Sequence, residues 1–320
     1  MRAIFDAGGM FASQSQQDVY LTVLMDTSVQ PELAAQAKQA LYPATTNILM
    51  HIEPFFEQAP TIDTLADLCL IFANDSTVVG ELVVQASRRE LKIAVITLQP
   101  DHVLSLATKA GFPIDEAVLV APGQEKVRVS AELQVVMEKL FAQLGEWVAR
   151  NCSETRLALA RAFSFVRTPL AREISRSTAL QNGAIGAAVF VPGADMSLMT
   201  LNQAKMLLQI AAAFNLPIGK ERLKELAVIL LSAFGFRAIS RRLAGYVPLL
   251  GWAIKGGIGY SSTLALGFAA TEYFTKGGDM SGLGKFLRGH LDSRRQKNPS
   301  TTAPAETFIE IKVDKTGDSI

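Results

Sequence analysis

Short apolar runs alternate with amphipathic segments along the first 150 residues. Most of the runs are rich in Val, Ile and Leu without strict alternation, which is typical of strands covered on both faces. The predicted strands are Val19–Met25, Asn47–Ile52, Leu68–Ala73, Ile93–Leu98 and Ala117–Val120. Helical spacing predicts helices at Pro31–Leu41, Val79–Glu90, Pro100–Ala110 and Ala131–Ala149. Because strands alternate with helices, residues 18–150 are predicted to form an α/β domain with a doubly wound, mostly parallel sheet, preceded by a flexible N-terminus at 1–17.

The pattern changes after residue 177, where the chain becomes apolar, rich in glycine and helical in spacing. Thr200 and Gln203 have the spacing of a capping box, which predicts a helix from there to Phe214. A second helix is predicted at Glu221–Phe234, and a glycine-rich stretch follows from Gly251 to Phe274. Residues 178–290 are therefore predicted to form an all-α domain, and 291–320 a mostly disordered tail.

Composition supports two domains, because 320 residues with 49% hydrophobic content exceed what one core usually holds. Lys and Arg number 31 against 30 Asp and Glu, so net charge gives no reason to expect nucleic acid as a partner. The two cysteines, Cys69 and Cys152, fit a reducing compartment, and residues 1–17 lack a secretory apolar core. These features predict the cytoplasm, with attachment to or insertion in the inner face of the cell membrane as a further expectation.

Basic clusters flank the apolar region on both sides. Residues 151–177 are predicted to be a basic helical connector, and a second cluster begins at Lys285. Cationic flanks favour an anionic bilayer surface, and a pair of solvated helices is the alternative interpretation. The residues predicted to mediate association with a membrane surface or another protein are Arg156, Arg161, Arg167, Trp252, Lys255, Lys285 and Arg288. Self-association is a further expectation.

The apolar region predicts a membrane span only as an alternative, in Leu243–Thr271, which is uncharged except for Lys255. A spanning helix needs about 20 uncharged residues. The longest uncharged runs, Ser177–Ala194 and Gly256–Thr271, are shorter and contain Pro, Asn, Gln or many glycines. A compact helical bundle is the favoured interpretation, and the small residues Gly251 and Gly259 suit close helix packing.

Candidate chemistry is sparse, and the best position for it follows the first predicted strand. Asp26, Thr27 and Ser28 stand there, before Pro31, and could bind a polar group at a helix N-terminus; a capping cluster is the simpler interpretation. The glycines and lysine of a phosphate loop are missing. His51, His102 and His290 are dispersed, without the spacing of metal ligands. No catalytic residue, metal or cofactor is predicted.

An ordered series of motifs in the apolar region resembles a known family. The series is Val191-Pro192-Gly193-Ala194-Asp195, Leu201-Asn202-Gln203-Ala204-Lys205-Met206, Phe234-Gly235-Phe236-Arg237, Val247-Pro248-Leu249-Leu250-Gly251-Trp252 and Thr263-Leu264-Ala265-Leu266-Gly267. It is similar to the uncharacterised helical domain that follows GTPase domains in many bacterial proteins and recurs in YcjF-type inner-membrane proteins. The resemblance covers about 100 residues and implies a GTPase-associated domain with membrane contact, without established catalytic residues.

That resemblance suggests that the first half is a degenerate, G-domain-like fold. At the position of a guanine-reading motif the chain has Thr97, Leu98, Gln99 and Pro100, without its Lys and Asp. The sequence therefore favours a non-enzymatic scaffold or regulator, in which a GTPase-like module without nucleotide motifs is fused to an apolar helical domain. The alternative is a nucleotide-binding regulator or weak NTPase that uses Asp26, Thr27 and Ser28.

Overall fold

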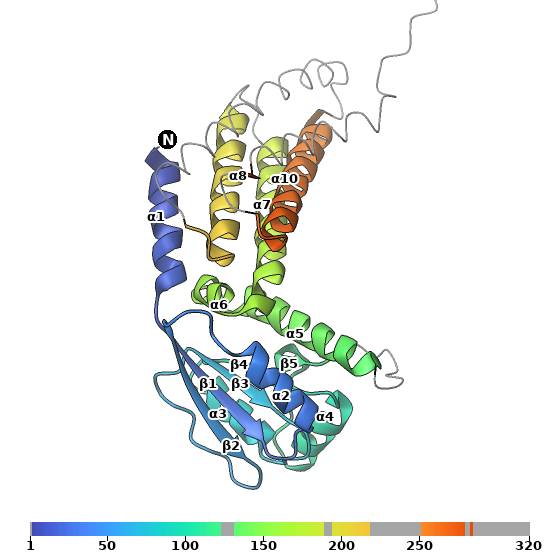
Figure 1. Cartoon of the computed structure of the whole chain (residues 1–320). Coiled ribbons are helices and arrows are strands. Elements are labelled where there is room, and N and C mark those ends of the chain that lie inside the picture. The colour runs from blue at the N-terminus through green and yellow to red at the C-terminus, as the bar shows by residue number, and fades with distance from the viewer. Residues whose placement is uncertain (1, 123–130, 189–193, 218–250, 279–281, 284–320) are drawn as a thin grey trace, which may run out of the picture.

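A five-stranded parallel sheet forms the first part of the molecule (Figure 1). The computed structural model describes residues 2–122, 131–188, 194–217, 251–278 and 282–283. The strands are β1 (Val19–Asp26), β2 (Ile48–Phe55), β3 (Leu68–Phe72), β4 (Lys92–Ile96) and β5 (Leu119–Val120), in the order β2-β1-β3-β4-β5. This is one of the two common orders of doubly wound sheets. The prediction of a parallel α/β domain followed by helices is confirmed.

Helices cover the sheet and then form a separate layer. They are α1 (Arg2–Gln16), α2 (Pro31–Ala40), α3 (Val79–Ser87), α4 (Pro100–Lys109), α5 (Ala131–Asn151), α6 (Arg156–Ala162), α7 (Ser164–Ala188), α8 (Ala194–Ala213) and α10 (Gly251–Thr275). The predicted helix Glu221–Phe234, the basic cluster with Lys285 and Arg288, and the tail 291–320 lie outside the described residues. So do most of the 191–195 and 247–252 motifs and the whole 234–237 motif.

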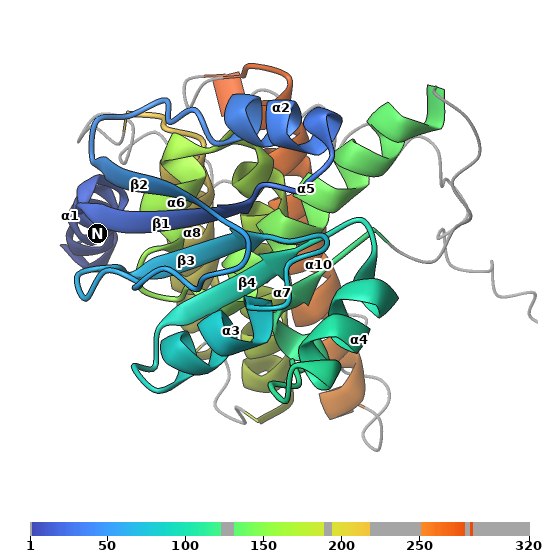
Figure 2. The ribbon, with the colours of Figure 1, turned by 90° about the horizontal axis from the view of Figure 1, so that it is seen from below.

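The two faces of the sheet have different coverings (Figure 2). Alternate residues of β1 and β3 point to opposite faces, as strand geometry requires. On one face Leu21 and Leu70 pack against α2 and α5. On the other face Leu24 and Ile71 pack against α3 and α4. Both faces are therefore buried, which explains why the strands are continuously apolar.

The connection from β2 to β3 runs across the sheet without a helix. Parallel strands need such a crossover, and it usually contains one. Here Ile62 of the connecting segment is 1% exposed and belongs to the apolar cluster under α3 and α4. Arg89 Nη1 donates a hydrogen bond of 2.7 Å to the Ile62 carbonyl oxygen. A fixed loop thus covers part of the face that a crossover helix would cover.

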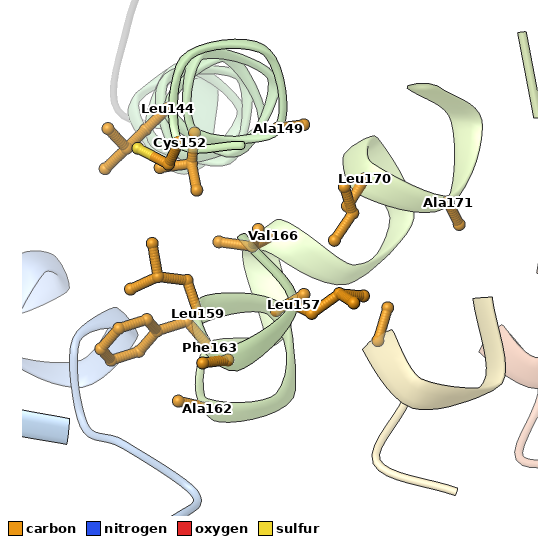
Figure 3. Packing of buried hydrophobic residues seen from close by; sticks show 14 of the residues in the cluster. Leu144, Ala149, Cys152, Leu157, Leu159, Ala162, Phe163, Val166, Leu170 and Ala171 are labelled. Atoms are coloured by element: carbon orange, nitrogen blue, oxygen red, sulfur yellow. The ribbon is translucent and has the colours of Figure 1, made fainter. Parts of the chain in front are cut away.

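One apolar cluster continues from the sheet into the helical part. The long helix α5 packs on β4, on β5 and on α7. In the sequence α6 lies between α5 and α7, and it packs on α7. Figure 3 shows Leu144 and Cys152 of the α5 segment facing Leu159, Phe163 and Val166. All of these side chains are buried. The sheet and the helical layer are consequently joined by a common hydrophobic core.

The N-terminal segment differs from its prediction. Residues 1–17 were expected to be flexible, but Arg2–Gln16 form α1, which packs along α8 and α6. Phe11 is 3% exposed, and Ala7 is also buried. The segment is ordered because the C-terminal helices give its apolar stripe a surface to cover.

Two predicted boundaries in the helical part are also wrong. Helix α7 runs through residues 164–188, so the expected division between connector and helical domain at 177/178 falls inside one helix. Helix α8 begins at Ala194, before the predicted capping box, and Gln203 is a core residue. The predicted end of this helix at Phe214 agrees with the structure to within one residue: α8 ends at Ala213, and Asn215 has a φ of 57°, in the left-handed region that Asn tolerates after a helix.

Small residues allow α7 and α10 to approach closely. A Cβ on Gly256 would lie 3.0 Å from the Gly183 carbonyl oxygen and 3.3 Å from the Ala187 Cβ. A Cβ on Gly267 would overlap Ser175. Side chains longer than hydrogen would therefore separate these helices. Close packing at Gly259, predicted from its spacing, is confirmed, since a Cβ there would lie 2.7 Å from the Asn182 carbonyl oxygen.

A hydrogen-bonded polar cluster fixes the register of α7, α8 and α10. Asn182, Gln203 and Thr263 are at most 2% exposed. Asn182 Nδ2 and Gln203 Nε2 each donate to Thr263 Oγ1 at 2.9 Å. Asn182 Nδ2 also donates to the Met199 carbonyl oxygen at 3.1 Å. Sliding one helix along another would leave these buried groups without partners, at a cost of about 1–3 kcal/mol each.

No helix among the described residues has the length and apolar character needed to cross a bilayer.

Gly145 should be essential where α5 crosses α7. Pro169 lacks the N–H that would bond to the Phe165 carbonyl, and a Cβ on Gly145 would overlap that oxygen and lie 3.0 Å from Pro169 Cγ. We expect Gly145→Ala to lower the free energy of unfolding by about 1–3 kcal/mol, measured by urea denaturation. The control is Gly9→Ala on exposed α1, where no atom lies within 4 Å; it should stabilise by up to about 1 kcal/mol. Equal effects would contradict the packing argument.

Candidate functional site

The sheet has one topological switch point, between β1 and β3. In doubly wound sheets ligands bind at the carboxyl ends of the strands where the strand order reverses. The segments that follow β1 and β3 meet there and contribute Asp26, Ser28, Asn74, Asp75 and Ser76. Two of the three residues predicted for a phosphate site, Asp26 and Ser28, belong to this cluster. The contribution from the β3 loop was not predicted.

The Asp26 carboxylate is fully engaged by donors of the protein. Asp26 is 1% exposed. Its Oδ1 accepts hydrogen bonds from Ser28 N at 2.9 Å and Ser28 Oγ at 2.7 Å. Its Oδ2 accepts from Asn74 N at 2.8 Å and Ser76 N at 3.0 Å. The backbone amides at the switch point, which are the donors that an incoming phosphate would need, therefore already bind an internal anion.

Further bonds connect the loops after β1 and β3. Asn74 is 7% exposed; its Nδ2 donates to the Ser28 carbonyl oxygen at 2.9 Å, and its Oδ1 accepts from Gln30 Nε2 at 3.1 Å. Asp75 N donates to Ser28 Oγ at 2.9 Å. Ser76 Oγ donates to the Phe56 carbonyl oxygen at 2.5 Å, which adds the segment after β2. The three segments at this edge are thus held by one hydrogen-bond network.

Neither sequence interpretation of Asp26, Thr27 and Ser28 matches this arrangement. Thr27 is exposed, and its backbone N–H donates to the Phe55 carbonyl oxygen at 2.9 Å. Helix α2 has Gln30 at its N-cap without a side-chain cap bond, so the trio does not cap that helix either. Asp26 instead bridges two loops. Two of its four donors, the backbone N–H groups of Asn74 and Ser76, lie in the loop after β3, 48 and 50 positions later, so local spacing could not reveal them.

An exposed histidine–aspartate pair lies at the rim of the cluster. His102 Nε2 and Asp75 Oδ1 are 2.8 Å apart, with side chains 43% and 55% exposed. The nearby Ser28 hydroxyl proton is directed to Asp26, not to His102. The pair therefore activates no nucleophile among the described contacts. Within the described residues there is also no group of three or more His, Cys, Asp or Glu side chains that could hold a metal ion.

The two cysteines do not offer an alternative nucleophile. Cys69 on β3 and Cys152 just after α5 are both buried and free. Burial raises the pKa of each thiol to about 12, from an ordinary value of 9.0. At neutral pH both remain protonated, and the thiol rather than the reactive thiolate is present.

The three connector arginines predicted to associate with a partner serve a structural role. Each donates to carbonyl oxygens at the C-terminal end of a helix: Arg156 Nη1 to Ala149 of α5 at 3.3 Å, and Arg161 Nη1 to Ser15 of α1 at 3.4 Å. Arg167 donates to two carbonyls of α6, both at 3.1 Å. Cations at helix C-termini are favourable because the last carbonyls lack partners and carry negative partial charge. Partial burial lowers the pKa of Arg167.

Two later arginines face solvent in a groove between α7 and α10. The groove has a volume of about 550 Å³ and contains Arg172, Arg176, Lys276 and Phe268. Arg172 and Arg176 are one helical turn apart, and neither has an ion pair or hydrogen bond with a described residue. The acidic residue in the lining, Glu272, pairs with Lys276 at 2.7 Å. This groove was not predicted as an association site.

Exposed apolar side chains continue from the groove along the same two helices. Phe268 is 40% exposed, and Leu180, one turn beyond Arg176 on α7, is 65% exposed. Ile258 on α10 is 44% exposed. The predicted association residues Trp252 and Lys255 begin this helix, but their side chains lie outside the description, as do Lys285 and Arg288 entirely. We call the surface formed by Arg172, Arg176 and Phe268, with Leu180 one turn further along α7, the α7–α10 face.

Comparison with protein-family models, with curated proteins and with solved structures finds no match for this chain.

Replacing Asp26 should destabilise the fold, because its carboxylate accepts hydrogen bonds from four donors. In Asp26→Asn an amide nitrogen would replace one carboxylate oxygen and face N–H donors, leaving buried groups without partners. We expect the free energy of unfolding to fall by about 2–4 kcal/mol, measured by urea denaturation. The control Asp115→Asn, at an exposed position where one side-chain oxygen still accepts from Ala117 N, should cost less than about 0.5 kcal/mol. If Asp26→Asn were as stable as the wild type, the carboxylate would not be needed for the fold. A role of Asp26 in binding a ligand would then be indicated.

Proposed function

We propose that this protein is a non-enzymatic scaffold in which an α/β platform with a closed switch point supports a helical layer that associates with an anionic membrane surface. The observation that carries the first part is the engagement of Asp26 by four internal donors. A phosphate entering there would find those amide groups already bonded to the Asp26 carboxylate. The negative charge of that carboxylate would also repel it. This argues against the alternative of a nucleotide-binding regulator that uses Asp26, Thr27 and Ser28.

The α7–α10 face supports the second part. Arg172 and Arg176 are like charges one turn apart, an arrangement that destabilises a helix slightly unless an anion lies nearby. Each cation near an anionic bilayer contributes about 1 kcal/mol, and exposed aromatic and aliphatic side chains can enter the headgroup boundary. Phe268 lies beside the arginines in the same groove. The charge and apolar surface that such attachment requires are therefore on the same helices.

The proposal does not depend on descent from a GTPase. The relationship to the GTPase-associated helical domain and to a degenerate G-domain rests on the ordered motifs between 191 and 267 and on the missing nucleotide motifs. The closed switch point and the α7–α10 face stand as observations without it. Self-association or binding of another protein through the same face is the competing proposal. The experiments below distinguish membrane binding from it.

Nucleotides should not stabilise the protein through the switch point. A ligand at 100 times its dissociation constant raises the unfolding free energy by about 2.7 kcal/mol. We expect GTP or ATP with Mg²⁺ at millimolar concentration to leave the thermal midpoint where it lies with the same concentration of nucleoside and Mg²⁺, measured by differential scanning calorimetry. A nucleotide-dependent increase that Asp26→Asn abolishes would instead establish the alternative function.

Anionic vesicles should bind the α7–α10 face. We expect the full chain to float with vesicles containing phosphatidylserine and not with neutral phosphatidylcholine vesicles. The double variant Arg172→Gln/Arg176→Gln should lose about tenfold or more in binding, because two cations contribute about 2 kcal/mol.

The matched control is Lys38→Gln/Lys109→Gln, which removes the same charge from exposed positions on α2 and α4. It should bind as the wild type does. Equal losses in both variants would indicate attraction by overall charge and not by this face. Wild-type protein that neither floats nor elutes larger than a monomer in size-exclusion chromatography would exclude membrane binding and self-association alike.

A further inference from the structure

A polar cleft lies between α1, α7 and α8, on a different part of the helical layer from the α7–α10 face. Its volume is about 170 Å³. Two cationic side chains line it, Arg156 from α6 and Lys205 from α8, and none of the described lining residues is acidic. Phe11 of α1 forms part of the wall. The cleft therefore exists only when the N-terminal helix is docked.

The positive charge in this cleft is not neutralised by the described protein. Lys205 is half-buried and has no ion pair or hydrogen bond with a described residue. Arg156 is also half-buried, and its one described bond, from Nη1 to the Ala149 carbonyl oxygen at 3.3 Å, leaves other guanidinium donors available. Two partly desolvated cations without a carboxylate favour an anion between them.

Thr178 supplies a second, independent indication of a ligand. It is 8% exposed, lines the cleft, and its hydroxyl has no hydrogen-bond partner among the described residues. Two other buried hydroxyls of the layer bond back to the carbonyl one turn earlier: Ser175 Oγ to Ala171 at 2.7 Å, and Thr271 Oγ1 to Gly267 at 2.8 Å. Thr178 makes no such bond, so its donor remains available in the cleft.

The opposite wall is held in place by the buried polar cluster. Asn202 lines the cleft, and its Nδ2 donates to Asn182 Oδ1 at 3.0 Å. Asn182 in turn bonds to Thr263. Lys205 and Thr178 therefore project from helices whose register is fixed, which is the arrangement that a preorganised binding site needs.

We propose that this cleft binds a small phosphate-type oxyanion, either free phosphate or the phosphoryl group of a small metabolite. Arg and Lys together supply the charge, and the Thr178 hydroxyl supplies a further donor to an acceptor-rich group. The volume is below the 300–1,000 Å³ usual for drug-sized ligands, so the cleft suits one phosphate group and not a nucleotide.

The probe is inorganic phosphate, titrated into the full chain at constant ionic strength with chloride as the reference. We expect phosphate to raise the thermal midpoint progressively, as a ligand of the folded state does. Lys205→Gln should weaken phosphate binding by about tenfold, and Thr178→Val, which removes the hydroxyl at nearly constant volume, by about threefold. Lys38→Gln, which removes a lysine from an exposed position on α2, away from both sites, should bind phosphate as the wild type does.

Each other outcome overturns the proposal. Phosphate that shifts the midpoint no more than chloride would show that the cleft holds no such anion. Equal weakening by Lys205→Gln and Lys38→Gln would indicate a general effect of charge. Should Lys205→Gln not fold by circular dichroism, Thr178→Val carries the test alone, and unchanged binding in that variant would refute the site. Lys205→Gln should leave vesicle flotation unchanged; weaker flotation with unchanged phosphate binding would assign the lysine to a lipid headgroup.

Discussion

The burial of α5, α6 and α7 against one another is the constraint on which the rest of the structure depends. These helices carry the apolar core from the sheet to the helical layer, and Figure 3 shows some of the buried side chains at this connection. Several helices end close together at this connection. The last carbonyl groups of each helix have no partner within that helix. Arg156, Arg161 and Arg167 satisfy some of those carbonyls. These arginines, which the sequence suggested as an association surface, therefore help to stabilise the ends of the helices.

A carboxylate that takes the place of a ligand explains why the switch point is stable without one. Loop amides at the end of a parallel sheet need an acceptor, and in ligand-binding folds a phosphate often provides it. Asp26 provides it here from within the chain. The amides are therefore satisfied without a ligand, and the same bonds connect the loops after β1 and β3.

Local patterns in the sequence predicted the local parts of this fold well. The strand at Val19 and the helix at Ala131 were predicted almost to their ends because burial on both faces and helical spacing are properties of adjacent residues. Strand order could not be predicted, since alternation of strands and helices is compatible with several orders. The α1 helix was missed because its partners, α6 and α8, lie more than 130 residues further along. A change of composition near residue 177 suggested a boundary where the chain is one unbroken helix.

The site depended even more on distant residues. Asp26 and Ser28 were noticed, but their role changed once the amides of Asn74 and Ser76 were known. Lys205 and Thr178 gave no signal at all, because a helix surface with one lysine and one threonine is ordinary until a second and a third helix enclose it. Their meaning comes from the absence of an acidic side chain among the described residues that line the cleft, which only the fold determines.

The docking of α1 also affects how the molecule is completed on the ribosome. Helix α1 is synthesised before α8, which covers Phe11 and Ala7 and follows roughly 180 residues later. At about 5–20 residues per second the ribosome takes on the order of 10–40 s to produce it. During that interval the sheet can form while the apolar side of α1 stays uncovered, so a nascent chain at this stage offers chaperones a helix that the finished protein hides.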